Sequence, residues 1–90
     1  LSPNLELSQN YPNPFNPVSK IDYSIPKSGI ISLHLVDING RLIEKLISNK
    51  YHFQNKYTHE INARNLNSGI YIVQLISEDE VVSRKIAVIK

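Results

Sequence analysis

The stretch ISLHLVDINGRLIEKLIS (residues 31–48) decides the fold, because it holds a strand pattern and the turn that ends it. A strand is expected at residues 30–37, because apolar residues occupy every second position from Ile31 to Leu35, the spacing of a strand with one buried and one wetter face. Asn39-Gly40 is the dipeptide that best tolerates the positive φ angles of a type I′ turn. A tight β-hairpin is therefore predicted from Asp37 to Arg41.

The partner strand of this hairpin is expected at residues 41–48. Its apolar residues also fit the i, i+4 spacing of an amphipathic helix, and they are Leu42, Ile43, Leu46 and Ile47. The hairpin turn favours the strand. The polar segment that follows, SNKYHFQNK (residues 48–56), is expected to be a loop or a ragged edge.

Similar alternation recurs along the chain in short runs separated by turns, at a spacing of about 8 to 12 residues. Further strands are expected near Leu5–Leu7 and at residues 18–25, 57–61, 69–77 and 81–90. The run GIYIVQLIS (residues 69–77) is almost continuously apolar, which predicts a central strand covered on both sides. Residues 77–80 are expected to form a turn. Residues 61–69 are expected to form a structured loop or a single helical turn that directs Leu66 inward.

About seven strands without a helix predict an all-β fold, an immunoglobulin-like antiparallel β-sandwich. Ninety residues make one domain, which we divide into a proline-rich strap (1–17) and the sandwich proper (18–90). Tyr23 and Tyr71 are expected to be internal.

The strap contains NYPNPFNP (residues 10–17). One interpretation is a polyproline ligand of the PxxP type, although such ligands usually carry a nearby basic residue and more prolines. The other is structural: prolines favour extended conformations in the residues before them, and the stiffened segment then presses Tyr11 and Phe15 onto the sandwich. We favour the second.

Composition excludes several classes of function. The ten basic residues, for a net charge of +2, are spread evenly, so nucleic acid is not an expected partner. No apolar run approaches the roughly 20 residues of a transmembrane helix. There is no cysteine, so packing alone must hold the fold. The chain begins without Met, and we interpret it as a segment cut from a longer protein.

No catalytic, metal or cofactor site is predicted. His34, His52 and His59 lack the short spacing of metal ligands. Residues 78–80 are acidic but lack the spaced ligands of a calcium loop. There is no GxSxG motif and no glycine-rich phosphate loop, so an enzyme is not expected.

The last strand has two interpretations. Arg84, Lys85 and Lys90 are either solvent-facing charges that keep an edge strand from pairing with other chains, or parts of a terminal strand that a partner recognises by strand addition. Composition alone favours the first.

Five segments, taken together, resemble the C-terminal sorting domain of proteins exported by the type IX (Por) secretion system of Bacteroidetes. They are LSQNYPNPFNP (7–17), IDYSIPKS (21–28), LVDINGR (35–41), LNSGIYIVQL (66–75) and RKIAVIK (84–90). The resemblance implies an immunoglobulin-like sandwich that follows a cargo domain and acts as a secretion signal. It also implies two partners, an outer-membrane translocon and a sortase-like protease, with passage through the periplasm to the cell surface or exterior.

The residues that carry these expectations fall into two sets. The structural motif comprises Pro12, Asn13, Pro14, Phe15, Asp37, Asn39, Gly40, Arg41, Gly69 and Tyr71. The suspected translocon-recognition set comprises Arg84, Lys85, Ile86, Val88 and Lys90. Deleting residues 86–90 is expected to abolish export while leaving most of the sandwich folded. The alternative function is an accessory sandwich that binds polysaccharide or spaces a catalytic domain, although the chain has no Trp for stacking on sugars.

Overall fold

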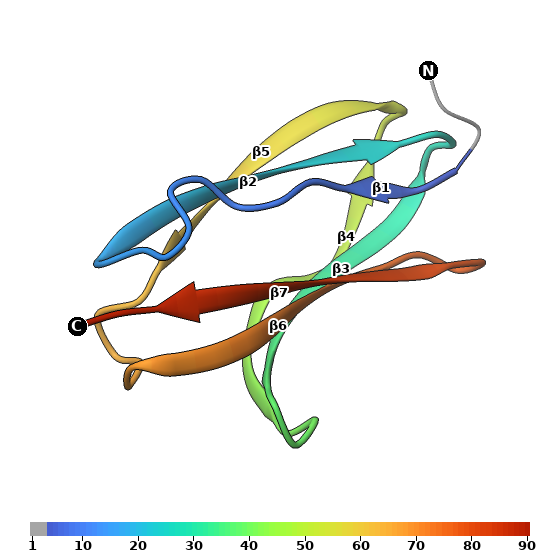
Figure 1. The fold of residues 1–90 in the computed structure, drawn as a ribbon. Helices are drawn as coiled ribbons and strands as arrows, with labels where there is room; N and C mark the ends of the chain where they lie inside the picture. Colours follow the sequence, from blue (N-terminus) through green and yellow to red (C-terminus); the bar gives the residue numbers. More distant parts are fainter. Residues whose placement is uncertain (1–3) are drawn as a thin grey trace.

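A computed structural model describes residues 4–90 and contains seven strands in two antiparallel sheets (Figure 1). The strands are β1 (Glu6–Leu7), β2 (Val18–Ile25), β3 (Gly29–Asp37), β4 (Leu42–His52), β5 (Asn55–Asn62), β6 (Gly69–Ile76) and β7 (Val81–Val88). The described residues form no helix. The predicted all-β, immunoglobulin-like sandwich is confirmed.

The two sheets have the strand orders β1-β2-β5 and β4-β3-β6-β7. In constant-type immunoglobulin domains the fourth strand pairs with the fifth. Here β4 pairs with β3 instead, and only two residues, Phe53 and Gln54, separate it from β5 in the opposite sheet. The larger sheet therefore has β4 and β7 as its two edges.

The β3–β4 hairpin forms as predicted, but its turn is of another type. The N–H of Gly40 donates to the Asp37 carbonyl at 3.0 Å, and the N–H of Asp37 donates to the Arg41 carbonyl at 2.9 Å. Gly40 has a φ of +85°, whereas Asn49 is the one non-glycine with positive φ in the described chain. The type I′ prediction for Asn39-Gly40 is therefore wrong. The loop has three residues and ends in a left-handed glycine, another common hairpin geometry.

Strand β4 is longer than predicted, and most of the expected loop at 48–56 belongs to β4 and β5. Three register shifts interrupt the β3–β4 pairing, and they leave Ile43 and Leu46 without a direct partner. Each bulge adds one residue to the strand, so the strict alternation is broken and two apolar residues become neighbours in the sequence. Bulges therefore account for the helix-like spacing. They also roughen an edge that would otherwise offer a regular template to another chain.

Strand β6 lies between β3 and β7, but it is not covered on both sides as predicted. Val73 and Leu75 face the other sheet and are fully buried, whereas Ile70 on the opposite face is 44% exposed. The prediction of a strand covered on both sides is therefore wrong, because one face of β6 is open to solvent.

The core lies between the sheets and is built from alternate residues of both. Its fully buried members include Ile21, Ile25, Leu33, Leu35, Ile61, Leu75 and Ile86. Leu66 points inward from its loop, as predicted. Tyr23 is internal as well, and its hydroxyl contacts His52 Nε2 at 2.9 Å while burial raises its pKa to about 12.

The two aromatic residues of the proline-rich segment differ in burial. Phe15 is 2% exposed and belongs to the core. Tyr11 is 47% exposed and does not press onto the sandwich, which corrects the expectation. Its hydroxyl donates to Asp22 Oδ1 at 2.9 Å, so a polar contact on the surface replaces the expected packing.

We expect Phe15→Ala to lower the free energy of unfolding by about 3 kcal/mol, because it leaves a cavity beneath the N-terminal segment. The thermal midpoint, followed by circular dichroism, should fall by roughly 10 °C or more. Phe53→Ala is the matched control, since Phe53 is 72% exposed. Equal midpoints for the two variants would contradict the assignment of Phe15 to the core.

Candidate recognition surface

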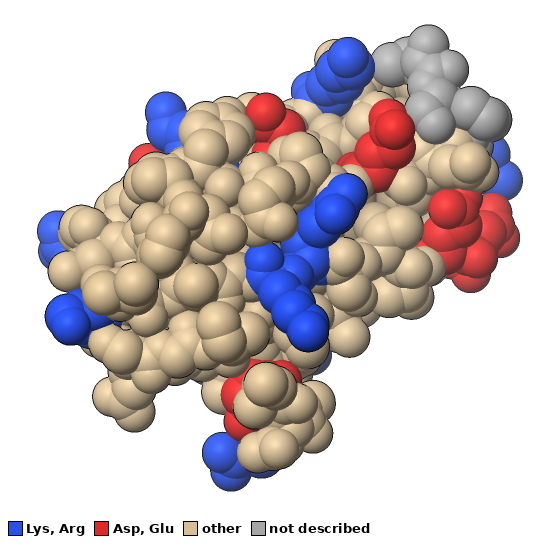
Figure 2. Space-filling model, viewed as in Figure 1, with Lys and Arg blue, Asp and Glu red and all other residues tan. Residues whose placement is uncertain are grey.

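Strand β7 carries most of the residues suspected of recognition, and it presents them to different environments. Ile86 and Val88 are 1% and 2% exposed and face the core. Arg84, Lys85 and Lys90 are exposed. The predicted set is thus split, because a partner that docks on the folded domain meets the cations and not the apolar side chains. Figure 2 shows basic side chains gathered over the middle of β7.

The outer edge of β7 is not free, because the N-terminal segment lies along its second half. The N–H of Phe15 donates to the Ala87 carbonyl at 3.0 Å, and the N–H of Ile89 donates to the Phe15 carbonyl at 3.1 Å. Phe15 and Val88 form a parallel bridge. The Ala87 N–H donates to Asn13 Oδ1 at 3.0 Å. The N-terminal segment therefore starts on the three-stranded sheet as β1 and crosses to the four-stranded sheet at Phe15.

A buried polar network fixes this crossing. Asn10 is 3% exposed, and its side-chain amide donates to Ser19 Oγ at 2.9 Å and to the Pro12 carbonyl at 3.1 Å. Ser19 Oγ in turn donates to the same carbonyl at 2.9 Å. Gln9 Nε2 donates to Asn10 Oδ1 at 2.7 Å and to the Lys85 carbonyl at 2.9 Å. The sequence predicts no role for Asn10 or Ser19, and the one signal for their buried contacts is an Asn beside a proline-rich run.

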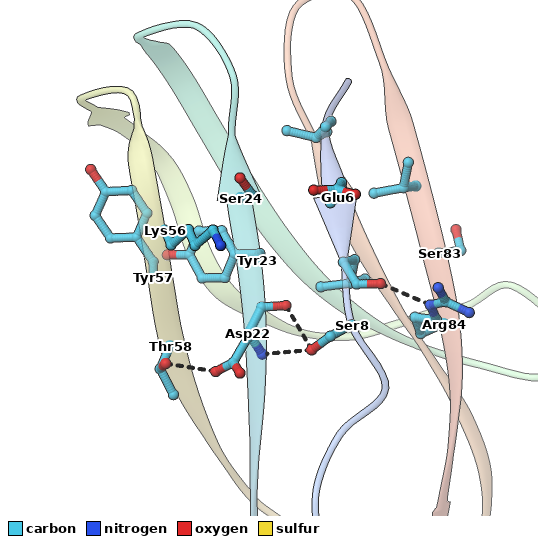
Figure 3. Close-up of a pocket in the computed structure, with 13 residues that line it drawn as sticks. Glu6, Ser8, Asp22, Tyr23, Ser24, Lys56, Tyr57, Thr58, Ser83 and Arg84 are labelled. Carbon is cyan, nitrogen blue, oxygen red and sulfur yellow. Dashed lines mark hydrogen bonds between the residues drawn. The ribbon is translucent and has the colours of Figure 1, made fainter. Parts of the chain in front are cut away.

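The first half of β7 is more open. In the described chain, the hydrogen bonds that the N-terminal segment makes with the β7 backbone all lie at Lys85 or beyond. Before that point β7 borders a groove of about 800 Å³, together with β1, β2 and β5 (Figure 3). Arg84 Nε crosses from β7 to donate to the Leu7 carbonyl at 2.8 Å.

The structural motif residues fall into two groups, one at the β3–β4 turn and one beside β7, where Asn13, Phe15, Gly69 and Tyr71 lie. Asp37 and Arg41 belong to the β3–β4 turn, where the Arg41 Nε lies 3.0 Å from Asp37 Oδ2. The pKa of Asp37 is lowered, first by the backbone N–H of Arg41. Gly69 pairs with Val88, and Tyr71 pairs with Ile86. Tyr71 is half-buried, packs against the core and donates its hydroxyl to the Asn67 carbonyl at 2.7 Å.

The histidines and carboxylates lie apart. No group of three or more His, Cys, Asp or Glu side chains in residues 4–90 is arranged to hold a metal ion. His52 packs against Tyr23, and burial lowers the pKa of His59. The hairpin turn at 77–80 forms as predicted, with the N–H of Ser77 donating to the Glu80 carbonyl at 2.9 Å. Over the same residues, no helix is long and apolar enough to cross a membrane.

The geometry defines a class of protein: an antiparallel sandwich whose first and last strands are held together and whose terminal strand is cationic. A family model described as the secretion system C-terminal sorting domain matches residues 9–90. The chain belongs to this family. Comparisons with curated proteins and with solved structures found no match.

Membership gives the domain its function. It is the C-terminal sorting signal of type IX secretion, which implies export to the cell surface or the extracellular space. The domain is handled by the type IX secretion system and is attached to a cargo chain. The family is a sorting-signal family and not an enzyme family.

We expect Asn13→Ala to release the second half of the β7 edge, because it removes the acceptor of the Ala87 N–H. A typical hydrogen bond contributes about 1 kcal/mol, so the Ala87 amide should exchange with solvent deuterium roughly fivefold faster, measured by NMR. Asn65→Ala, in an exposed loop, is the control. Unchanged exchange at Ala87 in the Asn13 variant would show that Asn13 does not hold the edge.

Proposed function

We propose that the outer-membrane translocon recognises Arg84, Lys85 and Lys90 on the folded domain. The observation that carries this proposal is the exposure of the cations: Lys85 faces away from the core, and Arg84, although it has the inward register of Ile86, is exposed at the edge strand. The apolar residues Ile86 and Val88 of β7 are buried, and its cations are the side chains left for a partner. Guanidinium and ammonium groups on a fixed strand suit an acidic partner surface.

Ile86 and Val88 have a positioning role in this proposal. Their burial sets which way the strand faces, since a slip by one residue would exchange the inward and outward side chains. Recognition by strand addition, in which a partner also binds the backbone, is then limited to the half of β7 before Lys85. The other half already pairs with the N-terminal segment.

Lys90 is held in place at the end of the strand. Its N–H donates to Ser68 Oγ at 2.9 Å, and its Nζ donates to the Arg64 carbonyl at 2.8 Å. These contacts tie residues beyond β7 to the loop before β6, so the last cation has a defined position relative to Arg84 and Lys85. A partner that binds all three cations meets a rigid spacing.

The remaining parts of the proposal concern the route and the partners. The strap of residues 1–17 joins the cargo to residues 18–90, and it also contributes β1 and Phe15 to the sandwich. The domain passes through the periplasm, and a sortase-like protease removes it once the cargo reaches the surface. In this proposal the domain itself catalyses nothing.

Export of a reporter tests the recognition residues. The chain is fused behind a reporter with a Sec signal peptide in a host that has the secretion system, and secreted reporter is measured. We expect the triple variant Arg84→Ala, Lys85→Ala, Lys90→Ala to lose export, and Lys85→Ala, Lys90→Ala to lose most of it. The double variant matters because it keeps the hydrogen bond from Arg84 to Leu7.

The matched control removes three exposed lysines elsewhere, Lys20, Lys27 and Lys50. Thermal midpoints of all variants must stay close to that of the parent chain. Normal secretion of the triple variant would overturn the proposal. Point variants replace the deletion of residues 86–90, because that deletion removes two core side chains and would not leave the sandwich folded.

A further inference from the structure

The outer face of the four-stranded sheet is apolar and uncovered. Ile30, Leu42, Ile70 and Val81 on this face are 41%, 49%, 44% and 58% exposed. The register places Ile76 beside Ser32 and Ile72 beside Val36 on the same face. The rest of the described chain lies on the other side of this sheet (Figure 1). By register these residues form two apolar patches at opposite ends of the face, one around Ile30 and Val81 and the other around Leu42 and Ile70. Scattered surface hydrophobics need no explanation, but exposed apolar patches mark interaction sites.

The charges on this face are all of one kind. His34 is opposite Lys45 on β4, and Ile72 is opposite Lys85 on β7, so both lysines point outward. The other outward positions that share these registers carry Ile, Val, Leu, Tyr, Ser, Gln or Ala. A polar row of Lys45, His34, Gln74 and Ser83 therefore crosses the middle of the face and separates its two apolar ends. The face has basic side chains and no carboxylate in these registers.

A second copy of the chain does not fit this face. Two identical faces would bring their lysines together, and like charges across an interface are unfavourable. The area is also small. Four strands of this length span roughly 500 Å², whereas each partner of a stable interface buries about 800 Å². A partner must therefore extend beyond the face.

The face and the recognition surface on β7 are continuous. Lys85 points outward on the sheet face and is also one of the three cations of the proposed recognition set. Arg84 lies on the other side of β7, so a partner that covers the face would have to wrap around the β7 edge to reach it, and this would bury the additional area. A single partner would then cover the apolar side chains of the face and also contact the cations.

We propose that this sheet face, with one apolar patch around Ile30 and another around Ile70, is a docking site for a protein of the export apparatus whose own apolar residues are bordered by carboxylates. The inference rests on the proposed function and extends it from β7 to the whole sheet. Apolar contacts from the face supply affinity, and Lys45 and Lys85 select an acidic partner.

The test uses the same reporter fusion. Ile30→Ser combined with Ile70→Ser should lower secreted reporter at least about fivefold, the effect of losing about 1 kcal/mol at an interface. Ile38→Ser is the matched control, because Ile38 is 65% exposed but lies in the β3–β4 turn. Lys45→Glu should also lower secretion, and Lys20→Glu should not. The lysine variants leave the apolar residues intact and so remain informative if the serine variants fold poorly.

The outcomes separate the two proposals. If the parent fusion is secreted and the double lysine variant Lys85→Ala, Lys90→Ala is not, the recognition residues on β7 stand. Normal secretion of both the isoleucine and the Lys45→Glu variants would then overturn the docking face alone. If the double and triple cation variants are secreted normally, the proposed function itself fails.

Two further measurements check other occupants. Sedimentation of the purified chain would reveal a dimer, and a dimer that Ile70→Ser dissociates would show that a second copy covers the face. Co-sedimentation with phosphatidylglycerol vesicles that is lost in the same variant would show that a membrane covers it. Either result overturns the proposal, which expects a monomer that does not bind the vesicles.

Discussion

The fold depends on the contact between Phe15 and the last strand. Through one residue the N-terminal segment exchanges two backbone hydrogen bonds with β7 and places an aromatic ring in the core. This contact closes the side of the sandwich where the first and last strands meet. It also determines which parts of β7 a partner can reach, because the N-terminal segment occupies the second half of the strand edge and the cations stay exposed. The proposed recognition surface on β7 thus depends on the hydrogen bonds that hold the N-terminal segment against the strand.

Much of the architecture follows from local sequence. Alternation over a few residues sets which side chains face inward, and turn residues mark where strands end, so strands such as β2 and β3 are predictable to within a residue or so. The errors arise where the pattern is broken by an extra residue. The bulges of β4 put apolar neighbours such as Leu42 and Ile43 together, and the three-residue turn uses Gly40 alone in the left-handed region. Both depend on the partner strand and not on the segment itself.

The candidate site was less predictable, because its key contacts join residues more than seventy positions apart. Nothing in the local sequence indicates that Asn13 accepts a hydrogen bond from Ala87, or that Gln9 reaches Lys85. The residue types of β7 identify the cations but not the half of the edge that is open. In GIYIVQLIS the apolar signal was present, but sequence cannot distinguish a strand covered on both sides from one with an open apolar face.

The pairing of the first segment with the last strand also bears on the order of synthesis. The ribosome makes residues 9–15 early and β7 late, so the hydrogen bonds that fix the N-terminal segment can form only after β7 has emerged. Contacts between distant segments carry a loop-closure cost that is met only at that stage. A translation product that stops short of β7 would lack both the cations and the closed sandwich. A closed domain therefore forms only on chains that have been translated through β7.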